Sequence, residues 1–149
     1  MIQRIQSIFL LLASGSLFGQ FGLPYLQTPL NDPSRTLPVL ADGVFNPFDN
    51  IGLLGLTVLA GLASLLAIFL FRNRAMQTRF TIGALLASGL LLALAGFMAY
   101  NTLSSLPPNG SAQYQAGLAL PVVALVFQWL AGRSIRKDEK LVRSMDRLR

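Results

Sequence analysis

Side chains that commonly perform catalysis or bind metal ions are scarce in this sequence. It contains no Cys and no His, which excludes thiol nucleophiles, disulfides, the usual zinc sites and the His or Cys ligands of most haem sites. Its six Asp and Glu residues include no pair on an apolar helix, and common hydrolase and nucleotide-binding motifs are absent. Carboxylates outside the apolar stretches could still hold a hard cation. We nevertheless expect a protein that is not an enzyme, with no metal site and no cofactor.

Two residues in the apolar part of the chain could serve a solute. Pro121 removes a backbone N–H donor near the middle of an apolar stretch and is predicted to bend it. Gln128, further along the same stretch, can hydrogen-bond across helices. The two residues form either a packing kink with an interhelical bond or a substrate site that also uses Ser88. The apolar stretches contain no ionisable residue away from their ends, which argues against proton-coupled transport and redox pumping.

The elements that must position these residues are four apolar stretches, in a chain that is 53% hydrophobic and 12% charged. They cover residues 5–23, 51–71, 80–100 and 115–132, each close to the ~20 residues that cross a bilayer. Asp49 and Asn50 can cap the second helix. The first stretch could be a cleaved secretory signal, but it stays apolar through Leu23, which favours an uncleaved anchor. The sequence predicts an all-α membrane protein with four transmembrane helices in residues 1–132.

The distribution of charge predicts the orientation of these helices. Lys and Arg lie before the first stretch, between the second and third, and after the fourth. Short loops rich in Lys and Arg stay in the cytoplasm, so we expect both termini there. The opposite side contains Asp32, Arg35, Asp42 and Asp49.

The loop at residues 24–50 is expected to lie outside the membrane. Its five prolines favour extended and turn conformations over regular helix or a central strand. It is either a simple connector or a cover across the outer helix ends, with Val44, Phe45 and Phe48 at the membrane interface. The second outer loop contains a turn signal from Pro107 to Gly110.

Small residues at helical spacing predict close helix contacts. Gly15 and Gly19 form a GxxxG pair, and Gly22 is expected one turn further along nearly the same face. These glycines either pack the four helices on one another or dock to a separate membrane protein.

The segment at residues 133–149 is predicted to form a short, basic, amphipathic cytoplasmic helix, with seven Lys and Arg against three Asp and Glu. It can lie on the anionic inner leaflet of the bilayer, dock on a protein, or bind RNA such as a ribosome. Acidic residues interrupt its basic run, which favours specific pairing. The residues expected to contact a partner are Arg136, Lys137, Asp138, Glu139, Lys140, Arg143, Asp146 and Arg147.

The two ends of the chain carry a family resemblance. The opening Met1-Ile2-Gln3-Arg4-Ile5-Gln6 and the closing segment at residues 135–149, IRKDEKLVRSMDRLR, resemble an uncharacterised family of small four-pass membrane proteins of the Bacteroidota. The resemblance implies a bacterial inner membrane. It implies no activity, because the family is classed only as a domain of unknown function.

The function expected from these features is that of a non-catalytic accessory subunit of a larger inner-membrane complex, such as a translocon, secretion or respiratory assembly. Its partners would be membrane proteins, contacted through the glycine faces and the tail within the lipid bilayer. One alternative is a small transporter or channel for a neutral or lipophilic solute. Another is a membrane anchor that contacts ribosomal RNA. No small-molecule substrate is evident.

Overall fold

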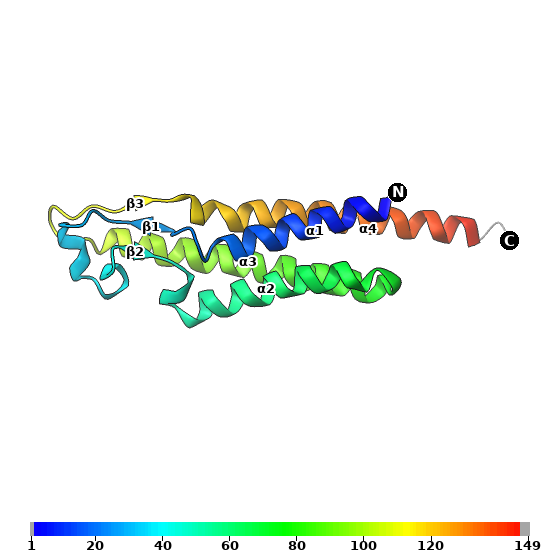
Figure 1. Cartoon of the computed structure of the whole chain (residues 1–149), viewed down its shortest axis with the longest axis horizontal. Coiled ribbons are helices and arrows are strands. Elements are labelled where there is room, and N and C mark those ends of the chain that lie inside the picture. The colour runs from blue at the N-terminus through cyan, green and yellow to red at the C-terminus, as the bar shows by residue number, and fades with distance from the viewer. Residues whose placement is uncertain (1, 147–149) are drawn as a thin grey trace.

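The computed structural model describes the backbone of residues 2–146 and the side chains of residues 5–141. In this part of the chain, four α-helices form an elongated bundle with short strands and most of the 3-10 turns at one end (Figure 1). The elements in chain order are α1 (Ile2–Gly19), β1 (Leu26–Gln27), η1 (Pro33–Thr36), η2 (Pro38–Leu40), β2 (Val44–Phe45), η3 (Pro47–Asp49), α2 (Ile51–Phe69), η4 (Leu70–Arg72), α3 (Arg74–Ser104), β3 (Gln113–Tyr114), η5 (Ala116–Ala119) and α4 (Leu120–Asp146).

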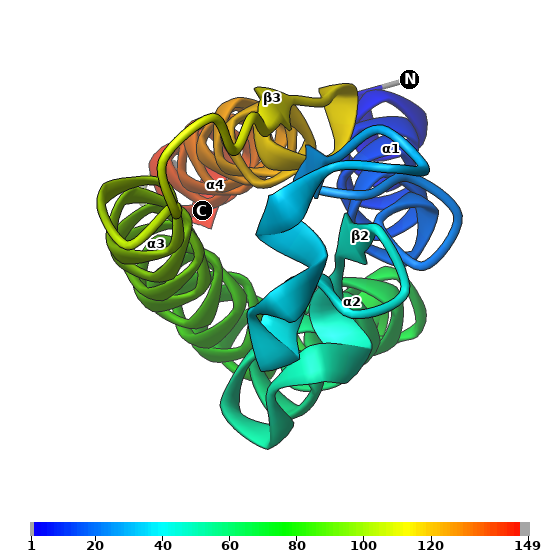
Figure 2. The same ribbon diagram turned by 90° about the vertical axis from the view of Figure 1, so that its left-hand side faces the viewer.

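The helices form a closed ring in which each packs on its neighbours in sequence and α1 returns to α4 (Figure 2). The start of α1, the end of α4 and the turn between α2 and α3 lie at the end opposite the strands (Figure 1). The segments that carry most of the Lys and Arg residues therefore share one end of the bundle, which we call the basic end. The strand end carries Asp32, Asp42 and Asp49.

Three helices in the described part of the chain are long and apolar enough to cross a membrane, namely Ile51–Arg72, Arg74–Ser104 and Ala116–Leu141. They overlap the second, third and fourth predicted spans, although the last two extend beyond the predicted bounds, and the all-α class is confirmed. As predicted, Asn50 caps α2, because its Oδ1 accepts hydrogen bonds from the backbone N–H groups of Gly52 (2.8 Å) and Leu53 (3.3 Å). Asp49 instead accepts a bond from the backbone N of Asn46, within the preceding turn.

The first helix is shorter than predicted. Its apolar part is Ile5–Gly19, after which the chain turns through i to i−3 bonds that end with the N–H of Gly22 on the carbonyl of Gly19. Pro24, which disfavours helix in the residue before it, prevents the helix from resuming. The expectation that Gly22 continues the helical face of Gly15 and Gly19 is therefore wrong.

Small residues fill much of the space between the helices. The closest approach is at Gly61 of α2, where an added Cβ would lie 2.7 Å from Cζ of Phe18 in α1. Beside it, the hydroxyl of Ser14 donates to the carbonyl of Gly61 (3.2 Å). Fully buried alanines line the same interior, among them Ala60, Ala84, Ala95, Ala99, Ala124 and Ala131.

The two outer loops pair with each other, which the sequence did not predict. β1 lies at the centre of a three-stranded antiparallel sheet of order β2-β1-β3, with Leu26 opposite both Phe45 and Tyr114. The prolines do exclude longer elements, since Pro33, Pro38 and Pro47 each begin a 3-10 turn. They leave room for a central strand of two residues, so the expectation of no central strand is wrong.

Asp32 joins these loops a second time. Its carboxylate accepts hydrogen bonds from the backbone N (3.0 Å) and hydroxyl (2.6 Å) of Ser111, and from the backbone N (2.8 Å) and hydroxyl of Ser34. These donors, those of Ser111 foremost, hold the pKa of Asp32 well below its ordinary value. The ionised carboxylate thus ties the loop before α2 to the loop before α4.

The last helix differs from the prediction at both ends. Pro121 is its second residue, where the missing N–H removes no intrahelical bond, so the predicted mid-helix bend at Pro121 is wrong. At its other end, α4 runs without a break from Leu120 to Asp146. The tail predicted as a separate helix from residue 133 is therefore the continuation of α4.

Candidate functional site

Gln128 lies at the centre of the bundle and connects three of its helices. Its Nε2 donates to the hydroxyl of Ser64 in α2 (3.0 Å) and to that of Ser88 in α3 (2.9 Å). All three side chains are completely buried. Because α2 and α4 face each other across the ring, the amide spans the interior rather than the seam between two neighbours.

This cluster has the chemistry of a structural bond. Both amide hydrogens of Gln128 are engaged, whereas Oε1 has no hydrogen-bond partner among the described residues. An amide and two hydroxyls supply no acid, base or activated nucleophile at ordinary pH. The alternative, a solute site around Ser88 and Gln128, also required a bend at Pro121. That bend is absent from α4, because Pro121 lies at the start of the helix.

A second buried polar pair closes the strand end of the bundle. The hydroxyl of Tyr25 donates to Oε1 of Gln20 (2.6 Å), with both residues fully buried. Burial raises the pKa of Tyr25 to about 12, against a smaller opposing effect of a bond with Thr57. The rings of Phe45 and Tyr25 pack edge-on, with their centroids 5.5 Å apart. The sequence had instead predicted Phe45 at a membrane interface. Sequence reasoning missed Gln20 and Tyr25, although both are polar groups beside the end of the first apolar stretch.

The glycine pair of α1 faces outward rather than into the bundle. Among the described residues, nothing lies within 4 Å of a Cβ built on Gly15, and Gly19 has only a side-chain carbon of Leu120 at 3.5 Å. Gly22 lies in the turn beyond the helix, near the carbonyl of Gly19 (3.8 Å). Internal packing, one of the two expected roles, is carried by Gly61 and the buried alanines instead.

The acidic and basic residues of the tail point in different directions. Asp138 turns toward α3, where its carboxylate lies 3.2 Å from a guanidinium nitrogen of Arg74. Arg74 also donates to the backbone carbonyl of Asp138 (3.3 Å). Arg136, Lys137 and Lys140 are exposed, while Glu139 is half-buried. Asp138 thus pairs with Arg74 within the chain, and its expected contact with a partner stays a prediction. The side chains of Arg143, Asp146 and Arg147 lie outside the described residues.

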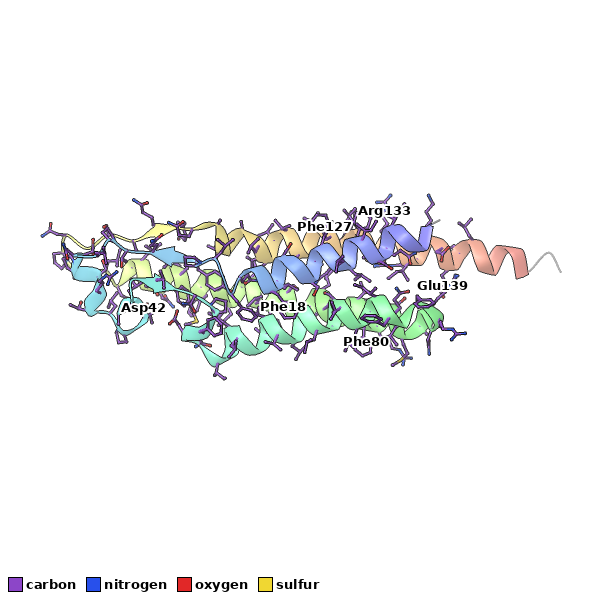
Figure 3. The ribbon with its side chains drawn as sticks, viewed as in Figure 1. Phe18, Asp42, Phe80, Phe127, Arg133 and Glu139 are labelled. Atoms are coloured by element: carbon purple, nitrogen blue, oxygen red, sulfur yellow. The ribbon has the colours of Figure 1, made fainter. Side chains whose placement is uncertain are left out.

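Arg133, about one turn before Arg136, lies on the outer edge of α4 (Figure 3). Its guanidinium carbon is 5.6 Å from the ring centroid of Trp129, a cation–π contact. Within the described part of the chain, no group of three Asp or Glu side chains could hold a metal ion.

The sequence model of one family, described as "Domain of unknown function (DUF4293)", matches residues 2–148, nearly the whole chain. The protein belongs to this family. Its membership confirms the resemblance to an uncharacterised family of unknown function. No curated protein and no solved structure matches the chain.

The DUF4293 match runs through all four helices, both outer loops and the tail. The buried amide, the outward glycines and the basic side chains therefore all belong to one family domain. The description of the family states no activity for these groups.

Proposed function

We propose that this DUF4293 protein is a non-catalytic subunit of a larger assembly in the inner membrane of a bacterium of the Bacteroidota. In this proposal the four helices cross the membrane, both termini lie in the cytoplasm, and α1 presents its outward glycine face to a helix of another protein. Three features support the proposal: the apolar outer surface of the bundle, the distribution of charge, and the surface of α1.

The first feature is a bundle that buries polar groups inside and exposes large apolar side chains outside. Ser64, Ser88 and Gln128 are buried, whereas Leu86, Leu90 and Phe97 on α3 are 61%, 62% and 63% exposed. In water, exposing this much large apolar surface along a helix is unfavourable, at about 25 cal/mol for each Å². In hydrocarbon the same surface matches its solvent, while hydrogen bonds between helices hold the bundle together.

The distribution of charge supports the proposed orientation. Arg72, Arg74 and Arg79 lie at the same end as the basic residues of α4 (Figure 1). At the strand end, Arg35 is the one cation among the described side chains. By the positive-inside rule, this distribution supports a cytoplasmic position for the basic end.

The observation that carries the proposed role as a subunit is the notch on the outer face of α1. Ile8 and Leu11 are 54% and 57% exposed, and Gly15, one turn beyond Leu11, leaves the backbone open. Gly15 and Gly19 form the only GxxxG pair in the sequence. Such a pair lets a second backbone approach closely, and van der Waals packing of this kind drives helix association in lipid.

The length of α1 also favours a partner. Its 18 residues rise about 27 Å, and the apolar part from Ile5 to Gly19 rises only about 22 Å against a hydrocarbon core of ~30 Å. A short span is accommodated by thinning the bilayer or by associating with other proteins. The buried amide of Gln128, by contrast, is already occupied within the bundle, so the favoured role is docking rather than transport.

The proposal is tested by purifying the tagged protein from native membranes in a mild detergent and measuring the mass and composition of the complex. We expect a defined complex that contains at least one other membrane protein. Gly15→Leu should release that protein, because the side chain fills the notch. Gly83→Leu is the matched control, since Gly83 is likewise an exposed helical glycine with nothing within 4 Å among the described residues. Recovery of the wild type only as a monomer or self-oligomer, or equal loss of the partner in both variants, would contradict the proposal.

A further inference from the structure

One exposed face of α4 changes in character along its length. Val122 and Val126 are exposed near the start of the helix, Trp129 follows at 52% exposed, and exposed cations come next. At 100° for each residue, Val122, Val126, Trp129, Arg133, Arg136 and Lys140 fall on a single face. The face thus runs from aliphatic through aromatic to basic, in the order of the layers of a bilayer leaflet.

The basic part of this face contains a hollow. A cavity of about 420 Å³ is lined by Trp129, Arg133, Arg136, Lys137 and Lys140. We call it the basic groove. No carboxylate lines it among the described side chains. Asp138 lies on the opposite side of the helix, held by Arg74. Glu139 lies about 60° around the helix from Arg136, at the edge of the basic face, and does not line the groove. The interruption of the basic run in the sequence therefore does not interrupt the groove.

We propose that the basic groove binds the phosphate headgroup of an anionic phospholipid of the leaflet in which Trp129 lies. This inference rests on the membrane insertion proposed above. A phosphate diester has a permanent negative charge and oxygens that accept hydrogen bonds from guanidinium and ammonium groups. The chains of the same lipid would lie along Val122 and Val126, below the headgroup.

The position of the groove along α4, next to Trp129, favours a lipid over a soluble anion. Trp side chains gather at the boundary between hydrocarbon and headgroups. Arg133 lies about 6 Å beyond Trp129 along the helix, within a headgroup layer of about 5–8 Å. Lys140 lies about 16 Å beyond Trp129, and its long side chain is directed back toward that layer because helical side chains tilt toward the N-terminus. RNA or an acidic protein would contact the cations alone, and the continuous apolar face below them would play no part.

Trp129 provides the test, because it is the only Trp in the chain and lines the groove. The full-length protein is reconstituted into phosphatidylcholine vesicles that contain a small, equal fraction of a bromine-labelled lipid, either phosphatidylglycerol or phosphatidylcholine. Bromine quenches Trp fluorescence on contact. We expect brominated phosphatidylglycerol to quench Trp129 more strongly than brominated phosphatidylcholine. Arg136→Gln with Lys140→Gln should reduce that preference by about fivefold for each cation removed.

The matched control is Arg72→Gln with Arg79→Gln, which removes the same charge from exposed positions at the same end of the bundle. A control that loses the preference equally would show general attraction and overturn the site. Equal quenching by both lipids in the wild type would overturn the site while leaving membrane insertion intact. Absence of quenching by either lipid would overturn insertion itself. Loss of the preference on adding inorganic phosphate or RNA at constant ionic strength would assign the groove to that ligand and overturn the lipid proposal.

Discussion

Replacing Gln128 at the centre of the buried cluster is expected to lower the free energy of unfolding less than replacing its two serine partners. Gln128→Leu deletes the two hydrogen bonds to Ser64 and Ser88 but also deletes Oε1, which has no partner among the described residues. The two serine hydroxyls that remain in Gln128→Leu can turn and donate to the carbonyl four residues earlier in their own helices. Replacing both serines by Ala instead keeps the amide and leaves its two N–H groups buried and unpaired. The two perturbations remove the same two bonds and differ in what remains behind.

The two perturbations should change the free energy of unfolding by different amounts. Interhelical hydrogen bonds in membrane proteins average about 0.6 kcal/mol, so Gln128→Leu loses about 1 kcal/mol of bonding. It also relieves the burial of an unsatisfied oxygen, which costs about 1–3 kcal/mol, and Leu is of similar size. We expect its free energy of unfolding to stay within about 1 kcal/mol of the wild type. Ser64→Ala with Ser88→Ala should lower that free energy by about 2–3 kcal/mol, because two donors lose their partners.

The assay is equilibrium unfolding of the purified protein in mixed micelles, followed by circular dichroism at increasing fractions of dodecyl sulfate. Ser16→Ala is the control, since the Ser16 hydroxyl bonds to the carbonyl of Leu12 in its own helix (2.8 Å) and its loss should change little. If Gln128→Leu is the more destabilised variant, the amide contributes more than its two bonds. The description of the cluster as a structural bond with one unsatisfied atom would then be refuted.

Three further predictions concern the packing and the outer loops. Gly117→Ala should destabilise the protein by about 1–3 kcal/mol in the same assay, because the new Cβ would lie 2.2 Å from the backbone oxygen of residue 23; an unchanged midpoint would contradict this. Gly61→Ala should also destabilise, through its clash with the ring on α1, whereas Gly15→Ala should not; similar values for both would count against the packing described. Asp32 has a folded-state pKa below its ordinary value of 3.8, so its stabilising effect is present above that value and disappears only as the pH falls through the lower folded-state pKa. The amide resonance of Ser111 should therefore not shift as the pH is lowered through 3.8, and a midpoint at that pH would refute the contact.

The sequence was sufficient for the helices that are defined by apolarity and a cap. Residues 51–71 were predicted almost to the residue, because Asn50 is a strong N-cap and Arg72 ends the apolar run. Apolarity alone misled at α1, where the chain remains apolar beyond Gly19 but has already turned. It also gave the wrong helix start near Pro121, because residues 115–119 are mostly apolar but are not α-helical. Pro121 therefore lies at the start of α4 rather than near the middle of the predicted span.

Contacts between distant segments were harder to anticipate. Gln128 was identified as a residue that could bond across helices, but its partner Ser64 depends on how α2 and α4 face each other across the ring. The pairing of β1 with β3 and the contact of Asp32 with Ser111 join segments that are far apart in sequence. Helical spacing would have separated Asp138 from the cations of the basic groove, but its pairing with Arg74 required the fold.

The most direct test of the account is to identify what lies against α1 in the native membrane. A photoreactive amino acid is placed at Leu11, beside the notch, and at Leu90 on the outer surface of α3, both of which are exposed. We expect a discrete crosslinked product with another membrane protein from Leu11, lost when Gly15→Leu is added, and none from Leu90. Crosslinks from Leu11 to lipid alone, or the same product from both positions, would contradict it.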